Sequence, residues 1–360
     1  MRKIIIIFLI IILIGFASPS YGIKDDEQQD PLTISAQTSI LIEANSGEAL
    51  YEKNAEEKTY PASITKIMTA LIAIENGNLD KMVKISQNAA GVEGSSIYLE
   101  KGELISLRDL VYGLMLRSGN DAAIAISEEI GGSTGNFVIM MNKRARELGA
   151  FNTNFMNPNG LHDPEHYTTA GDMALISRAA MQNSEFKKIA ATKDWVTDRG
   201  EGKYNYFYNK NKVVYQYDGG TGIKIGYTKA AGRTLVASSE RNGMELICVV
   251  MNAPDWFQDT YKLMDYAYNQ YETVKIADGQ RPIKAVRIWQ GNKNFILIGP
   301  REDILCPIRK DTENEISIEY VLPGRQKAPV RRWQEAGHMK IYVNDCYLFS
   351  KPLFYMEDVE

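Results

Sequence analysis

The chain has 360 residues, 44% of them hydrophobic, and a formal net charge of −4 at pH 7. This length predicts about two domains with buried cores, and without a basic excess nucleic acid is not an expected partner. The three histidines show no paired-ligand spacing, so we expect neither a metal site nor a cofactor.

Residues 1–22 have the pattern of a secretory signal peptide. Arg2 and Lys3 precede an apolar run from Ile4 to Phe16, and small residues suited to cleavage follow. The run is short for a membrane span. An uncleaved N-terminal anchor is the alternative, and it is the only membrane contact that we expect. In either case the folded part of the chain acts outside the cytoplasmic membrane.

Residues 23–33 are polar and charged, which predicts a flexible leader before the first domain. Residues 34–43 predict a strand, and residues 49–52 begin a returning strand after a turn. A buried helix follows. It begins near Pro61, whose missing N–H suits a first helical position, and it ends near Glu75.

Ser63 and Lys66 lie three residues apart in this helix, so their side chains share one face. A serine hydroxyl is a weak nucleophile until a base removes its proton. A lysine can be that base if burial and the positive end of a helix keep it neutral. Because the Ser-x-x-Lys pair is common by chance, it supports a catalytic hypothesis only together with other motifs.

The middle of the chain predicts a cluster of helices, at residues 106–117, 121–130, 137–148 and 172–181. Ser118 and Asn120 lie at the junction of the first two helices, where a hydroxyl and an amide can point into a cleft. Taken alone, Ser118-Gly119-Asn120 is an ordinary helix stop.

The pattern then changes to strands, which we predict at residues 213–217, 222–227, 234–239 and 245–251, with a closing helix at 259–271. Early and late strands must pair to bury both sets. This predicts an α+β domain over residues 34–273 with clustered helices. Residues 274–360 form short alternating segments separated by turns, which predicts a small all-β sandwich domain.

Two further features of the sequence are its three cysteines and a lysine within a predicted strand. The three cysteines, Cys248, Cys306 and Cys346, form no disulfide framework, and we expect buried free thiols. Lys224 lies between two isoleucines in a predicted strand, which is unusual beside a core. A solvated face of an edge strand is the alternative interpretation.

Three segments together resemble a known family. Ser63-Ile64-Thr65-Lys66, Ser118-Gly119-Asn120 and Lys224-Ile225-Gly226 are similar, in order and spacing, to the motifs of the low-molecular-mass penicillin-binding proteins. These are the serine-type D-Ala-D-Ala carboxypeptidases of peptidase family S11. The resemblance covers about residues 34–272. It implies a penicillin-binding-protein and β-lactamase-like transpeptidase domain in the cell wall zone or periplasm, with peptidoglycan stem peptides as substrates and β-lactams as covalent inhibitors.

The resemblance also implies catalytic roles for four residues. Ser63 would attack the carbonyl of the penultimate D-alanine and form an acyl-enzyme, with Lys66 as the base. Ser118 would pass a proton to the leaving nitrogen of D-alanine. Asn120 would bind the substrate amide.

The same resemblance assigns substrate binding to the predicted strand at residues 224–227. Lys224 would bind the terminal carboxylate and keep the catalytic lysine neutral. Gly226 lies on the same strand, and the backbone N–H groups of Ser63 and Tyr227 would form the oxyanion hole. Ile225 departs from the family, which usually has threonine there, so one hydrogen bond to the carboxylate would be lost.

Two alternatives follow from these residues. A degenerate homologue that binds or scaffolds peptidoglycan with little turnover is favoured by Ile225 and disfavoured by the intact motif residues. A serine β-lactamase would use a glutamate in a loop after the second motif. Glu165 lies in that region, but its sequence context is not that of the β-lactamases.

Overall fold

The computed structural model describes residues 32–360. The predicted signal peptide and nearly all of the predicted leader therefore lie outside the described residues. Among the helices of residues 32–360, none is both long and apolar enough to cross a bilayer.

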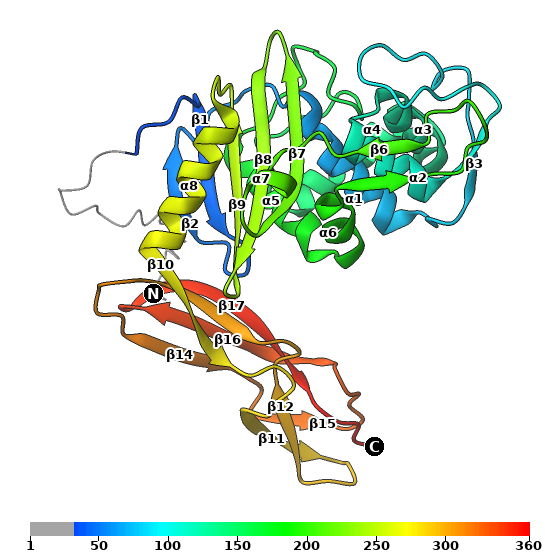
Figure 1. Cartoon of the computed structure of the whole chain (residues 1–360). Coiled ribbons are helices and arrows are strands. Elements are labelled where there is room, and N and C mark those ends of the chain that lie inside the picture. The colour runs from blue at the N-terminus through cyan, green and yellow to red at the C-terminus, as the bar shows by residue number, and fades with distance from the viewer. Residues whose placement is uncertain (1–31) are drawn as a thin grey trace, which may run out of the picture. The chain divides into compact units, whose positions relative to one another are not determined.

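A five-stranded antiparallel sheet forms the centre of the first domain (Figure 1). Its strand order is β2-β1-β9-β8-β7. The strands are β1 (Thr38–Glu43), β2 (Ala49–Lys53), β7 (Gly220–Thr228), β8 (Gly232–Arg241) and β9 (Met244–Met251). The N-terminal strands thus pair with the late strands, with Ile40 opposite Val249. The predicted pairing of early and late strands is confirmed.

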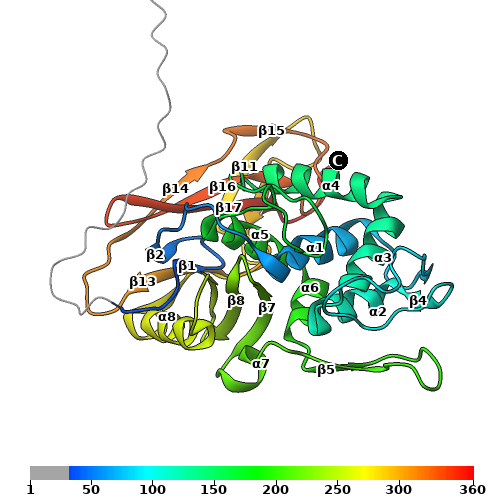
Figure 2. The ribbon, with the colours of Figure 1, turned by 90° about the horizontal axis from the view of Figure 1, so that it is seen from above.

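Helices cover the sheet and extend beyond its β7 edge (Figure 2). They are η1 (Ala62–Thr65), α1 (Lys66–Asn76), α2 (Leu107–Tyr112), η2 (Gly113–Arg117), α3 (Asn120–Gly131), α4 (Thr134–Glu147), α5 (Ala170–Gln182), α6 (Ser184–Ala191), α7 (Val213–Gln216) and α8 (Trp256–Gln270). On the central strands, Ile42 and Ile247 pack into the main core with α1 and α5. Helix α8 packs against β8 and β9.

One predicted strand is wrong. Residues 213–217 have the β-branched and aromatic composition of a strand, yet Val213–Gln216 form helix α7. The side chain of Asn211 accepts a hydrogen bond from Val213 N at 3.1 Å, which starts the turn. Lys212 O then accepts from Tyr215 N at 3.0 Å. A local side-chain bond therefore overrides the composition.

Short paired strands connect the helices of the first domain. They are β3 (Met82–Lys84) with β4 (Leu104–Ser106), and β5 (Asp194–Val196) with β6 (Tyr206–Tyr208). Sequence patterning missed all four because three residues are too few to establish a period of two. Trp195 and Phe207 face each other across the β5–β6 hairpin. Phe207 is fully buried.

The C-terminal part is β-rich, as predicted. Its strands are β10 (Tyr271–Ala277), β11 (Lys284–Trp289), β12 (Phe295–Gly299), β13 (Ile304–Arg309), β14 (Ile316–Val321), β15 (Arg325–Lys327), β16 (Glu335–Val343) and β17 (Cys346–Tyr355). Six of them form one sheet in the order β14-β16-β17-β12-β11-β15, and β10 pairs with β13. Their apolar residues form a separate core that includes Ile298, Ile341 and Leu353.

All three cysteines are free thiols. Cys248 and Cys306 are buried, as expected, but Cys346 is exposed, and the prediction of a buried thiol there is wrong. Cys346 is the first residue of β17, directly after the turn at Asn344 and Asp345. A residue at a hairpin end does not have to face the core.

Candidate active site

Ser63 and Lys66 meet at the start of the first long helix. The 3₁₀ turn η1 carries Ser63, and α1 begins at Lys66. Lys66 Nζ and Ser63 Oγ lie 3.0 Å apart, as their shared helical face predicts. The Lys66 side chain is completely buried. A potential nucleophile and base are therefore in direct contact.

The contacts of Lys66 are compatible with a neutral amine. Its Nζ donates to Asn120 Oδ1 at 2.7 Å and also to the backbone oxygen of Asn159. A charged ammonium has three donor hydrogens, whereas the neutral amine has two and a lone pair. The two oxygens use both donors of the neutral form, and the lone pair is then available to the Ser63 hydroxyl.

Burial and the neighbouring lysine charges act in the same direction, and only the charge of Asp121 opposes them. Burial lowers the pKa of Lys66 well below its ordinary value, and the nearby Lys224 lowers it further. Burial, with a contribution from Lys210, lowers the pKa of Lys224 to about 7. Desolvation and like charge both disfavour the ammonium form. Lys66 can therefore accept a proton at moderate pH.

The Ser118-Gly119-Asn120 segment turns the chain between two helices. The π-helical turn η2 ends at Arg117, Ser118 follows in a left-handed conformation with φ 64°, and α3 begins at Asn120. Asn120 Nδ2 donates to Glu93 O at 2.6 Å, which fixes the amide with its oxygen towards Lys66. Ser118 is 5% exposed.

The buried carboxylate of Asp121 anchors the loop beside Asn120. It accepts hydrogen bonds from Ile97 N at 3.0 Å, Leu99 N at 3.1 Å and Ser96 Oγ at 2.6 Å. Asn120 N donates to Ser95 O at 2.7 Å in the same loop. The loop and the start of α3 are thus held together as one unit.

Strand β7 forms the other side of the site. Lys224 is 1% exposed, so the solvated edge-strand interpretation is wrong. Its neighbour Ile225 is half-buried, and Tyr227 is 63% exposed. A Cβ atom placed on Gly226 would lie 2.8 Å from Ser63 N. Only glycine therefore allows the strand to approach the nucleophile this closely.

Several residues that support the site were not predicted. His166 Nδ1 accepts from Met156 N at 3.2 Å, so its Nε2 carries the proton and contacts Thr65 Oγ1 at 2.9 Å. Burial lowers the pKa of His166 to about 4, so the ring is neutral at moderate pH. Thr234 Oγ1 donates to Pro61 O at 3.0 Å and ties β8 to η1.

Other contacts carry no sequence signal. Asn159 contributes its backbone oxygen, which every residue type has. Lys210 Nζ donates to Ser95 Oγ at 3.4 Å, and nothing in its neighbouring sequence marks it. Glu165, the candidate glutamate of the β-lactamase alternative, is exposed.

Comparisons with known proteins all indicate the same family. The family model described as D-alanyl-D-alanine carboxypeptidase, Peptidase_S11, matches residues 24–255. A second, described as penicillin-binding protein 5, C-terminal domain, matches residues 271–360. D-alanyl-D-alanine carboxypeptidase DacF of Bacillus subtilis (strain 168) is 33% identical over 372 residues, which is 100% of this chain and 95% of the relative.

Solved structures agree with these matches. Penicillin binding protein 5 from Haemophilus influenzae is 33% identical with a TM-score of 0.72, and the match covers 92% of this chain and 99% of that one. PBP3 from Streptococcus pneumoniae, described as a peptidoglycan synthesis regulatory factor, is 26% identical with a TM-score of 0.76, over 91% of this chain and 100% of that one. These structures confirm the predicted fold class.

Proposed function

Because the chain belongs to the D-alanyl-D-alanine carboxypeptidases of peptidase family S11, we propose that it removes the terminal D-alanine from peptidoglycan stem pentapeptides through an acyl-enzyme on Ser63. The observation that carries the mechanism is the contact between Ser63 Oγ and the buried Lys66 Nζ at 3.0 Å. The proposal assigns this serine and lysine the roles of nucleophile and general base.

In the acylation step Ser63 Oγ bonds to the carbonyl carbon of the penultimate D-alanine, and the Ser63 proton moves to Lys66 Nζ. The peptide C–N bond then breaks. The proton returns through Ser118 Oγ to the leaving nitrogen, so that free D-alanine departs with a neutral amine. Asn120 orients Lys66 and offers its amide to the substrate.

Two further groups complete the acylation. The N–H groups of Ser63 and Tyr227 stabilise the oxyanion, a contribution of about 3 kcal/mol for each donor. The close approach of β7 at Gly226 supports this pairing. Lys224 supplies positive charge for the terminal carboxylate, without the threonine hydroxyl that Ile225 replaces.

In the deacylation step a water molecule attacks the ester carbonyl, Lys66 accepts a water proton, and Ser63 leaves with a proton. The products are the shortened stem peptide and free enzyme. A β-lactam offers a strained amide to the same nucleophile, so we also expect covalent acylation by penicillin. The assignment of residues 1–22 as a signal peptide supports action in the cell wall zone or periplasm.

The test is release of D-alanine from a pentapeptide ending in D-Ala-D-Ala, with residues 23–360 and a Ser63→Ala control. We expect release that the control lacks, together with a penicillin adduct on Ser63 seen by mass spectrometry. Release equal to the control would contradict the proposal and favour a degenerate homologue. Rapid, repeated penicillin hydrolysis would instead favour a serine β-lactamase.

A further inference from the structure

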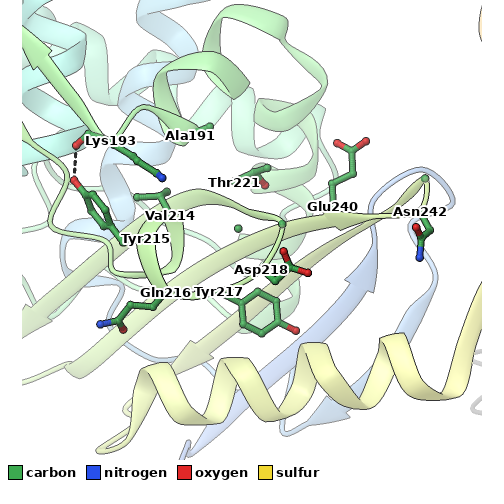
Figure 3. Close-up of a pocket in the computed structure, with 13 residues that line it drawn as sticks. Ala191, Lys193, Val214, Tyr215, Gln216, Tyr217, Asp218, Thr221, Glu240 and Asn242 are labelled. Atoms are coloured by element: carbon green, nitrogen blue, oxygen red, sulfur yellow. Dashed lines mark hydrogen bonds between the residues drawn. The ribbon is translucent and has the colours of Figure 1, made fainter.

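A broad polar groove lies outside the site described above, between the end of α6, helix α7, the first residues of β7 and the turn after β8 (Figure 3). Its volume is about 790 Å³, which is within the range of ligand sites. The lining includes Lys193, Tyr215, Tyr217, Asp218, Glu240 and Asn242. The catalytic mechanism uses none of these residues.

Two tyrosine rings are held rigidly in this groove. Tyr215 OH donates to Lys193 O at 2.6 Å, and the Tyr215 side chain is 49% exposed (Figure 3). Tyr217 OH donates to Asp265 Oδ1 at 2.6 Å, and its ring stacks on Tyr261 with centroids 5.0 Å apart. A ring fixed by its own hydroxyl loses little entropy when it binds a ligand.

The outer face of the β5–β6 hairpin carries two more exposed tyrosines. Trp195 and Phe207 share the inner face, so Tyr206 and Tyr208 point outward and are 51% and 48% exposed. Burial is the largest cause of the raised pKa of Tyr215, and Tyr206 and Tyr208 add to it, so both lie within electrostatic range of Tyr215. We call these three residues the tyrosine surface.

Two contacts connect the tyrosine surface to segments that form the catalytic cleft. The guanidinium of Arg117 lies 3.8 Å from the ring centroid of Tyr208, and Arg117 directly precedes Ser118. Lys210, two residues after Tyr208, donates to Ser95 in the loop held beside Asn120. A substrate that extends from the cleft towards Tyr208 would contact the tyrosine surface.

The groove favours one chemical class of ligand. Lys193 and the carboxylates of Asp218 and Glu240 place opposite charges around it, which disfavours both a polyanion and a polycation. Ala191 and Val214 are its only aliphatic side chains among the residues described, which disfavours a lipid. Fixed aromatic rings surrounded by hydrogen-bonding groups suit a neutral sugar, whose hydroxyls both donate and accept.

We infer that the tyrosine surface and the adjoining groove bind the glycan strand to which the stem peptide is attached. The inference rests on the proposed function and adds the place at which the glycan strand of that substrate would bind. Tyrosine and arginine are enriched among the few residues that contribute most of the binding energy at interfaces. The sugar chain would thereby hold the stem peptide close to Ser63.

The first experiment is calorimetric titration of residues 23–360 with glycan strands stripped of their stem peptides. The double variant Tyr206→Ala with Tyr215→Ala should weaken binding about tenfold. Tyr206→Ala alone keeps the hydroxyl contact of Tyr215 and should give an intermediate loss. Tyr347→Ala removes a tyrosine that is 55% exposed in another sheet, and should leave the affinity unchanged.

The second experiment compares kcat/KM for a glycan-linked and a free pentapeptide. In the double variant we expect about a tenfold fall for the glycan-linked substrate, through KM, and less than about a twofold change for the free peptide. Equal falls on both substrates would overturn the inference, as would the absence of saturable glycan binding. If neither substrate loses D-alanine, the proposed function fails while the titration still decides the glycan site.

Discussion

Lys66 and Lys224 are two buried lysines whose positive charges would repel each other. Burial is the largest cause of the lowered pKa of each, and Lys224 adds to the effect on Lys66. The proposed mechanism needs them in different states, with Lys66 neutral and Lys224 charged. A negatively charged substrate carboxylate beside Lys224 favours this distribution because it stabilises the nearer ammonium.

This arrangement predicts a pH optimum for kcat/KM on a D-Ala-D-Ala peptide. Activity should fall at low pH as Lys66 becomes protonated, and fall above an apparent pKa of about 7 as Lys224 loses its charge. Lys224→Arg keeps a positive charge at all accessible pH, so its alkaline decline should shift upward. An unchanged alkaline decline in that variant would mean that another group causes it.

Ile225 is the position at which the cleft departs from its family pattern. Its side chain is half-buried on β7, opposite Leu235 of β8. Ile225→Thr should raise kcat/KM about tenfold or more, because a hydroxyl can then donate to the substrate carboxylate. Ile225→Val is the matched control, since it keeps the β-branched shape without the hydroxyl. Equal activities of the two variants would show that shape, not the hydrogen bond, matters.

At the scale of elements, the sequence predicted what depends on local periodicity. The face shared by Ser63 and Lys66 follows from helical spacing, and the predicted helix start at Ser106 agrees with its cap, since Ser106 Oγ accepts from Asp109 N. The sequence did not predict α7, where the side chain of Asn211 turns a strand-like segment into a helix. The sequence also did not predict the role of the backbone oxygen of Asn159, because every residue type has this atom.

The packing of β7 against η1 requires a residue without a side chain at position 226. Gly226→Ala would place a Cβ atom 2.8 Å from Ser63 N and 3.1 Å from Ile64 N, so the strand must move away from the nucleophile. We expect kcat to fall about a hundredfold, because a displacement of reacting groups by about 1 Å can lower the rate by about that factor. The measurement is D-alanine release, with thermal unfolding recorded in parallel.

Gly324→Ala is the control for this change, because a Cβ atom there meets no atom within 4 Å. It should leave both D-alanine release and the unfolding midpoint unchanged. If Gly226→Ala behaved in the same way, β7 would have room to relax, and the close approach would not be required for catalysis.

At the scale of the whole molecule, apolar residues gather in separate cores. The main core contains residues from Ile40 to Met251, and the C-terminal core contains residues from Ala277 to Val359. Helix α8 belongs with the first domain, because it packs on β8 and β9 and buries Leu263. We therefore propose that the boundary between the two domains falls after α8.

Truncation tests this division. A chain of residues 23–273 keeps α8 and should fold, with kcat/KM for a free pentapeptide within about threefold of residues 23–360. A chain of residues 23–255 lacks α8, exposes the apolar face of β8 and β9, and should unfold or aggregate. Circular dichroism, thermal unfolding and D-alanine release distinguish these outcomes. Inactivity of a folded 23–273 chain would show that the β-rich domain supports the cleft, and the two cores would then be separate in packing but not in function.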